Sequence, residues 1–383
     1  MAAIERAASV LAAALMLPGV LPGALSTAQA ETAPDRAELS LRWLGYHDRQ
    51  AGLGRITVHS PAAALVLPLS ARWSLDAGAT QDTVSGATPR WHSSVSGASV
   101  MADRRRAADL RVNHHGDGRG LSLGGAWSGE DDFESRTLSG EWREWSDDRN
   151  RTLTAGLALT LDRITATGQP TLDERRRTTQ ALIGITQVWT PRDVLSLTWT
   201  RSSARGYHSD PYKWLDRRPR ERDRSTVQLG WNHHIPDTQS TLRTHYRFYR
   251  DTFGVQAHTL EARWVQPLGE RFSLTPGLRL YSQRAASFYR DPVPAQAGGH
   301  SALPPGPPAD AEGAPFSADA RLAGFGAVAL SVNGQWRFTP DRWLDLRLER
   351  YEQRAAWRWG GNGSPGLSPL MAWQWQVGLR MRF

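Results

Sequence analysis

The chain has 383 residues, no cysteine and a formal net charge of +8. The lack of cysteine excludes disulfide bonds, thiolate metal sites, a cysteine nucleophile and a lipidated N-terminal cysteine. Of the 46 basic residues only Lys213 is a lysine, and the planar guanidinium of the others suits bidentate contacts to carboxylate and phosphate. A GC-rich genome would also produce this bias, so the bias alone indicates no function.

The N-terminal segment has the pattern of a secretory signal. After Arg6, residues 7–25 are mostly apolar, and residues 28–30 read Ala-Gln-Ala, a small-x-small cleavage pattern. Two prolines interrupt the apolar run, which is also short for a membrane span. We therefore expect residues 1–30 to be a cleaved signal peptide and residues 31–383 to be exported, which argues against a nucleic-acid partner.

Alternation of apolar and polar residues recurs along the exported part. In residues 151–163, Leu153, Leu157 and Leu161 share one face, whereas Thr160 and Asp162 lie on the other. The same pattern recurs in residues 72–82, 225–234, 240–251, 271–283 and 342–353. Segments of this length can cross hydrocarbon at a tilt, whereas strands of soluble proteins are usually shorter.

Two kinds of connection take turns between these segments. Short, turn-forming stretches occupy residues 68–71, 114–119, 146–151, 190–193, 235–238, 267–270 and 339–342. The longest connections occupy residues 84–103, 163–177, 204–223, 285–318 and 358–370. The alternation predicts an all-β fold, a single transmembrane antiparallel up-and-down β-barrel of about 16 strands (14 possible), with short periplasmic turns and long extracellular loops.

Tryptophans accompany the short turns. Each of seven lies within a few residues of one: Trp73, Trp145, Trp189, Trp231, Trp264, Trp336 and Trp343. We expect them to form an aromatic girdle at one membrane interface.

The last segment alternates strictly and ends on an aromatic residue. Its apolar face contains Trp375, Val377, Leu379, Met381 and Phe383. Bacterial outer-membrane barrels resemble this chain in ending on such a strand, which their assembly machinery is thought to recognise. Closure requires a partner for this strand, because unpaired backbone groups in lipid are costly, and residues 37–46 are the expected partner.

With the apolar residues facing lipid, the other face of each strand lines the lumen. The candidate lumen and constriction residues are Arg243, Arg247, Asp251, Glu261, Arg263, Arg279, Tyr281, Asp345, Arg347 and Glu349. Two interpretations stay open: ion-pair ladders that stiffen the wall, or a constriction that selects solutes. An excess of arginine would favour anions.

Four stretches near the loops resemble a known bacterial family. They are "DTVSGATPR" (82–90), "GYHSDPYK" (206–213), "YRFYRDTFGVQAHTLE" (246–261) and "PGLRLYSQRAASFY" (276–289). The family is catalogued as domain of unknown function 3570, and the resemblance implies an outer-membrane barrel without an established activity. Within these stretches we single out Ser85, Gly86, Pro89, Asp210, Pro211, Tyr212 and Lys213, which we expect to form Asx-type turns, to contact a partner or to fold into the pore.

No enzyme, cofactor or metal is expected. His208, Ser209 and Asp210 are adjacent in sequence, but a catalytic triad needs convergent side chains and an oxyanion hole. Within each adjacent histidine pair, at 114–115 and 233–234, the two side chains point to opposite faces of a strand, so neither pair can chelate a metal. We expect an outer-membrane, porin-like passage for small hydrophilic solutes in a Gram-negative bacterium, in which the arginine excess would favour anions.

The alternative is a non-conducting scaffold that holds a partner protein or ligand through its loops or lumen. The expected partners are outer-membrane lipid and lipopolysaccharide, the barrel assembly machinery, and a periplasmic or surface partner.

Overall fold

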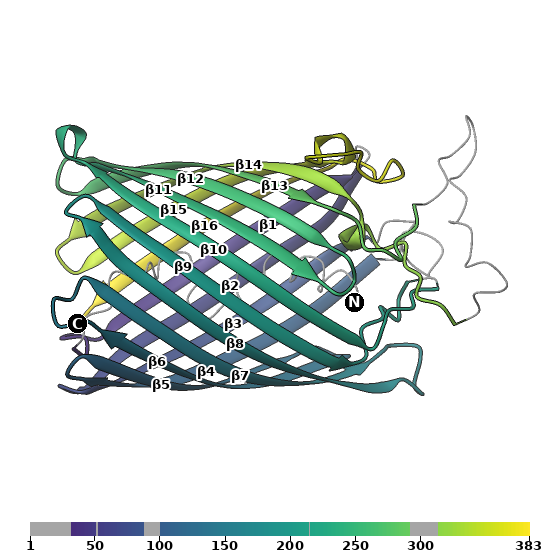
Figure 1. Ribbon diagram of the computed structural model, residues 1–383, viewed down its shortest axis with the longest axis horizontal. Helices are drawn as coiled ribbons and strands as arrows, with labels where there is room; N and C mark the ends of the chain where they lie inside the picture. The colour runs from purple at the N-terminus through teal and green to yellow at the C-terminus, as the bar shows by residue number, and fades with distance from the viewer. Residues whose placement is uncertain (1–31, 51–52, 88–99, 214, 292–312) are drawn as a thin grey trace.

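The computed structural model describes residues 32–50, 53–87, 100–213, 215–291 and 313–383. Within these residues sixteen strands form one closed antiparallel barrel in which each strand pairs with its sequence neighbours (Figure 1). The predicted fold class and the higher of the two strand numbers are confirmed. The expected signal peptide and Pro89 lie outside the described residues.

The strands are long and evenly sized along the chain. Their bounds are β1 Glu38–Gln50, β2 Leu53–Ser70, β3 Trp73–Ala87, β4 Val100–Gly116, β5 Arg119–Gly129, β6 Phe133–Trp145, β7 Arg151–Thr165, β8 Asp173–Thr190, β9 Asp193–Gly206, β10 Glu221–Ile235, β11 Ser240–Asp251, β12 Gln256–Leu268, β13 Phe272–Gln283, β14 Phe325–Thr339, β15 Arg342–Arg354 and β16 Leu370–Arg382. The only helical pieces in the described part are three-residue 3₁₀ turns: η1 Pro236–Thr238, η3 Ala320–Leu322 and η4 Ala355–Trp357.

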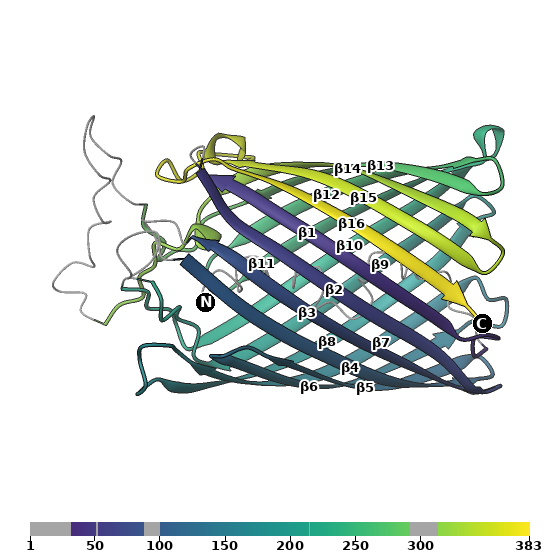
Figure 2. The same cartoon turned by 180° about the vertical axis from the view of Figure 1, so that it is seen from behind.

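The barrel closes through its first and last strands, as the alternation of the C-terminal segment predicts. Figure 2 shows β1, in purple, beside β16, in yellow. Leu41 faces Leu379 and Trp43 faces Val377 in this pairing. Closure leaves no sheet edge whose N–H and C=O groups would face lipid without partners.

The outer surface of the barrel is apolar over the middle of the strands. Leu138, Leu157 and Ile183 expose 67%, 70% and 59% of their surface. Residues that alternate with them line the lumen and are mostly polar. An outward apolar band around a closed barrel is the surface that a bilayer covers, so we treat the barrel as membrane-spanning. No helix in the described ranges is long and apolar enough to cross a membrane.

The two ends of the barrel differ. At one end, the turn end, short turns join each even-numbered strand to the next strand, from β2–β3 to β14–β15. At the other end, the loop end, the longer connections include residues 166–172, 207–220 and 355–369. Two connections at the loop end, residues 130–132 and 252–255, are as short as the turns.

The aromatic girdle is smaller than the sequence suggests. Trp73, Trp189, Trp231, Trp264 and Trp336 are exposed beside the turns. Trp145 and Trp343 instead lie on the lumen face, because each shares the parity of inward residues on its strand. Trp343 packs under the Arg380 guanidinium, which lies 4.7 Å from the ring centroid.

Candidate functional site

On the lumen wall, one arginine of β13 bonds to β15 across the intervening strand β14. Arg279 on β13 faces the small Ala329 on β14, and Arg279 donates to Glu349 on β15 at 2.6 Å. Ala327 and Ala329 leave room for this reach because neither has side-chain atoms beyond Cβ. Arg347 donates to the same Glu349 carboxylate at 2.7 Å.

Most of the predicted lumen residues form similar bonds. Arg263 pairs with Glu261. Asp251 accepts from Arg222 at 2.6 Å, and Asp345 accepts from Gln335 at 2.9 Å. Tyr281 donates to Gln283 at 2.5 Å. The ion pairs among these contacts agree with the first of the two interpretations, ion-pair ladders in the wall, and do not exclude a constriction that selects solutes.

Arg243 and Arg247 behave differently from the other predicted lumen residues. Arg243 faces Arg263 in the β11–β12 pairing and forms no salt bridge in the described part of the protein. Within the described residues, the one hydrogen bond of the Arg247 side chain goes to the Thr259 hydroxyl, at 3.4 Å. Two cationic side chains on β11 therefore lack a carboxylate partner.

Other inward arginines share this lack of an ion-pair partner. Among the described residues, the lumen arginines without a salt bridge are Arg42, Arg111, Arg224, Arg243, Arg247, Arg337 and Arg380. The lumen carboxylates without one are Asp76, Asp109 and Asp345. The uncompensated charge in the lumen is therefore positive. Arg42, Arg111 and Arg224 were not among the lumen residues predicted from the sequence, although their inward positions on alternating strands could have identified them.

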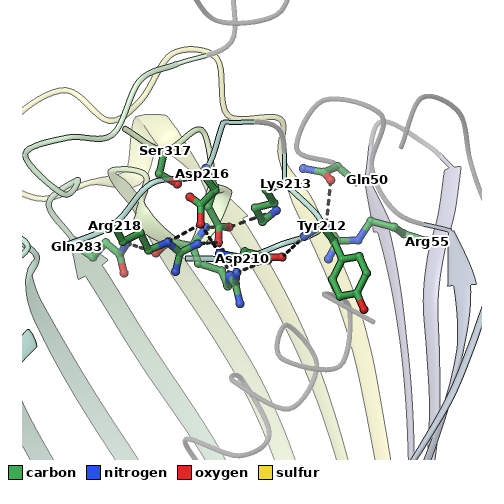
Figure 3. Close-up of polar contacts among 11 residues, drawn as sticks. Gln50, Arg55, Asp210, Tyr212, Lys213, Asp216, Arg218, Gln283 and Ser317 are labelled. Carbon is green, nitrogen blue, oxygen red and sulfur yellow. Dashed lines mark hydrogen bonds and ion pairs between the residues drawn. The ribbon is translucent and has the colours of Figure 1, made fainter. Parts of the chain in front are cut away.

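At the loop end, six charged residues form a buried cluster that we call the loop cap: Asp210, Lys213, Asp216, Arg218, Asp319 and Arg321. Figure 3 shows Asp210, Asp216, Arg218 and Lys213, all from the β9–β10 connection, and Asp319 and Arg321 of the β13–β14 connection bond to them. Asp319 is completely buried and accepts from Arg218 at 2.7 Å. Arg321 bonds to Asp319 and, at 2.9 Å, to Asp210. Burial disfavours charge on Arg218, but Asp216 and Asp319 outweigh it and raise the pKa of the guanidinium.

Apolar side chains lie beside this charged cluster. Phe253, Phe288, Leu322 and Leu367 are buried together and come from three different connections of the loop end. Backbone bonds also join the connections: Arg217 and Phe316 exchange two N–H···O bonds, each 2.8 Å long. The loops on this side of the barrel therefore form a packed unit rather than separate excursions.

The predicted loop motif at 210–213 lies at the junction of several connections. Asp210 accepts from the Tyr212 backbone N–H at 3.1 Å, which is the expected Asx-type turn. The Tyr212 hydroxyl donates to Asp132 at 2.6 Å, and Gln169 donates to the Pro211 carbonyl at 3.0 Å. Burial, followed by the Asp132 bond, raises the pKa of Tyr212. Ser85 and Gly86, also predicted as loop residues, lie instead within strand β3.

His208, Ser209 and Asp210 do not converge. His208 is buried edge-on against Phe253, with ring centroids 5.8 Å apart. The Ser209 hydroxyl accepts from the Arg218 backbone N–H at 3.0 Å, and Asp210 bonds to Arg321. Burial, and then the positive charge of Arg176, lower the pKa of His208 from 6.5 to about 3. The described residues also contain no group of three or more His, Asp or Glu that could hold a metal ion.

A family model described as "Protein of unknown function (DUF3570)" matches residues 7–100, 96–173 and 169–369. The chain belongs to the DUF3570 family. The resemblance drawn from the four loop-proximal stretches is confirmed. Among curated proteins nothing matches the sequence of this DUF3570 member.

Several solved structures match the chain at low similarity. The siderophore receptor PirA from Pseudomonas aeruginosa is 10% identical with a TM-score of 0.42; the match covers 85% of this chain but only 57% of the receptor. A bacterial polysaccharide outer membrane secretin is 11% identical with a TM-score of 0.49, over 91% of this chain and 98% of the secretin. The CymD monoaromatic hydrocarbon channel is 10% identical with a TM-score of 0.41, over 91% and 88%.

Proposed function

We propose that this DUF3570 protein is an outer-membrane passage for small hydrophilic solutes that prefers anions. The carrying observation is the positive imbalance of the lumen, where more arginines than carboxylates lack an ion-pair partner among the described residues. Side-chain charges that line a pore raise the local concentration of the opposite ion, so unpaired arginines favour anions. Paired residues such as Arg279 and Glu349 contribute rigidity and little net field.

Five of the unpaired arginines lie in two regions of the wall. Arg224, Arg243 and Arg247 lie on the adjacent strands β10 and β11, and Arg42 and Arg380 lie on the adjacent β1 and β16. An anion that enters the lumen would meet these guanidinium groups without first having to break a salt bridge.

The loop cap favours a second candidate, a non-conducting scaffold that holds a partner through its loops. Packed connections with buried charges such as Asp319 could close the mouth of the barrel permanently. In either case we propose that the protein is not an enzyme. Its proposed environment is a Gram-negative outer membrane, where lipid and lipopolysaccharide surround it. The proposed recognition signal for the assembly machinery is the apolar face of the last strand: Trp375, Val377, Leu379, Met381 and Phe383.

Single-channel recording in a planar bilayer tests the passage. The wild type should give stable conductance steps, and replacing two unpaired arginines, Arg243→Gln with Arg247→Gln, should reduce the preference for chloride over potassium. Arg119→Gln with Arg151→Gln is the matched control, because both side chains are exposed at the turn end and outside the lumen. Equal selectivity in the wild type and the lumen variant would show that these arginines do not set the preference.

A further inference from the structure

The outer face of the barrel carries a second group of arginines at the loop end. Six of them, which we call the arginine belt, project outward from β6 to β9: Arg136, Arg163, Arg175, Arg177, Arg201 and Arg205. Each lies on the loop side of the apolar residues on the same face of its strand: Arg163 follows Leu161 and Arg201 follows Trp199, whereas Arg136 comes before Leu138. The belt therefore begins where the apolar band ends.

The strand pairing places these cations next to one another. Arg177 on β8 directly faces Arg205 on β9, and Arg175 directly faces Arg163 on β7. Like charges on directly facing positions destabilise a sheet. Fold stability alone therefore does not account for this arrangement.

Acidic residues compensate only part of the belt. Arg136 pairs with Glu134, Arg163 with Asp173, and Asp223 bonds to both Arg201 and Arg205. Arg175 and Arg177 are exposed, and their side chains form no ion pair or hydrogen bond within the described ranges. Two outward guanidinium groups thus remain available at the centre of the belt.

We propose that the arginine belt binds the phosphate groups of a glycolipid in the surrounding membrane leaflet. A guanidinium binds phosphate through two parallel N–H···O bonds. Each of the two available guanidinium groups on β8 can therefore bind a phosphate in this way. Below the belt, Leu161 and Ile183 expose 52% and 59% of their surface and can lie along the acyl chains of the same molecule. A phosphorylated lipid fits both features, whereas free phosphate fits only the arginines. The inference requires the barrel to lie in a membrane but does not depend on solute passage.

Competitive lipid binding to the detergent-purified full chain, read by native mass spectrometry, tests the proposal. The probes are bisphosphorylated lipid A, the same lipid after enzymatic removal of its phosphates, and inorganic phosphate as competitor. The variant is Arg175→Gln with Arg177→Gln, and Arg119→Gln with Arg151→Gln is the control with two exposed arginines removed from the turn end. Heat-modified migration on gels verifies that each variant is a folded barrel.

We expect the wild type and the control to retain lipid A and the belt variant to bind it about thirtyfold more weakly, since each arginine near an anionic lipid surface contributes about a factor of five. The dephosphorylated lipid should bind the wild type as weakly as lipid A binds the belt variant. Unchanged binding in a folded belt variant, equal binding of the dephosphorylated lipid, or an equal loss in the control would each overturn the proposal. Displacement by millimolar inorganic phosphate would also overturn it, because the site would then be one for a free anion.

Discussion

The loop cap can be tested by removing a single charge. In Asp319→Asn the side chain keeps its shape and can still accept from the Arg321 backbone N–H, which lies 3.0 Å from Asp319 Oδ1. The substitution removes a negative charge that contacts three cations: Arg218, Arg321 and, at 3.7 Å, Lys213. Asp210 and Asp216 would then face three cations.

The size of the effect follows from burial. Breaking a buried ion pair typically costs about 3 to 5 kcal/mol. The Arg321 side chain is 22% exposed and can be partly rehydrated, so we expect the lower end, about 3 kcal/mol. Because each 1.4 kcal/mol is tenfold, local opening of the cap should become about a hundredfold more frequent.

Amide hydrogen exchange measures this opening directly. Protection should fall at Arg217 and Phe316, whose amides bond across the two connections, and should stay unchanged in the barrel strands. Asp173→Asn is the control, since its pair with Arg163 is exposed and should contribute little to stability. Unchanged protection at Arg217 would refute a cap held by buried charge, and an equal loss in the strands would refute a cap that opens separately from the barrel.

Two further predictions concern the cap and the lipid face. Because the buried His208 has a pKa of about 3 and an open loop would restore 6.5, only the open form binds a proton between these values. The cap should therefore be fully stable above pH 6.5 and lose stability with acidification, by up to about 2 kcal/mol at pH 5. If the amides of residues 207–220 are as well protected from hydrogen exchange at pH 5 as at pH 7.5, this prediction is wrong. Leu157→Arg places a charge on the lipid face in the middle of β7 and should reduce the unfolding free energy in vesicles by about 2 to 4 kcal/mol. A loss below about 0.5 kcal/mol would mean that this face does not contact hydrocarbon.

The sequence predicts the barrel well because strand alternation is a local signal. The lipid face of Leu157, the lumen face of Arg243 and the partner of the last strand all follow from a period of two and from the need to close the sheet. The inward orientation of Trp145 and Trp343 was not predicted, because their place was inferred from proximity to a turn and not from the alternation of inward and outward residues along the strand. Parity would have placed both in the lumen.

The site is less predictable because it depends on contacts between distant parts of the chain. Whether Arg279 meets Glu349 depends on the register of β13, β14 and β15, and these residues lie 70 positions apart. Arg321 and Asp210 are 111 positions apart and come from two irregular connections. Residue types alone indicated a structured loop at 210–213, but no periodic pattern links that loop to Asp319.

The reversal potential under a potassium chloride gradient tests the central claim most directly. It should be recorded for the wild type and for Asp319→Asn, so that a mouth closed by the cap is distinguished from a barrel that cannot conduct. We expect a potential of the sign set by chloride in at least the variant with the opened cap, because the uncompensated charges of the lumen are arginines. A folded barrel that stays silent in both forms, or a potential of the sign set by potassium, would contradict the account.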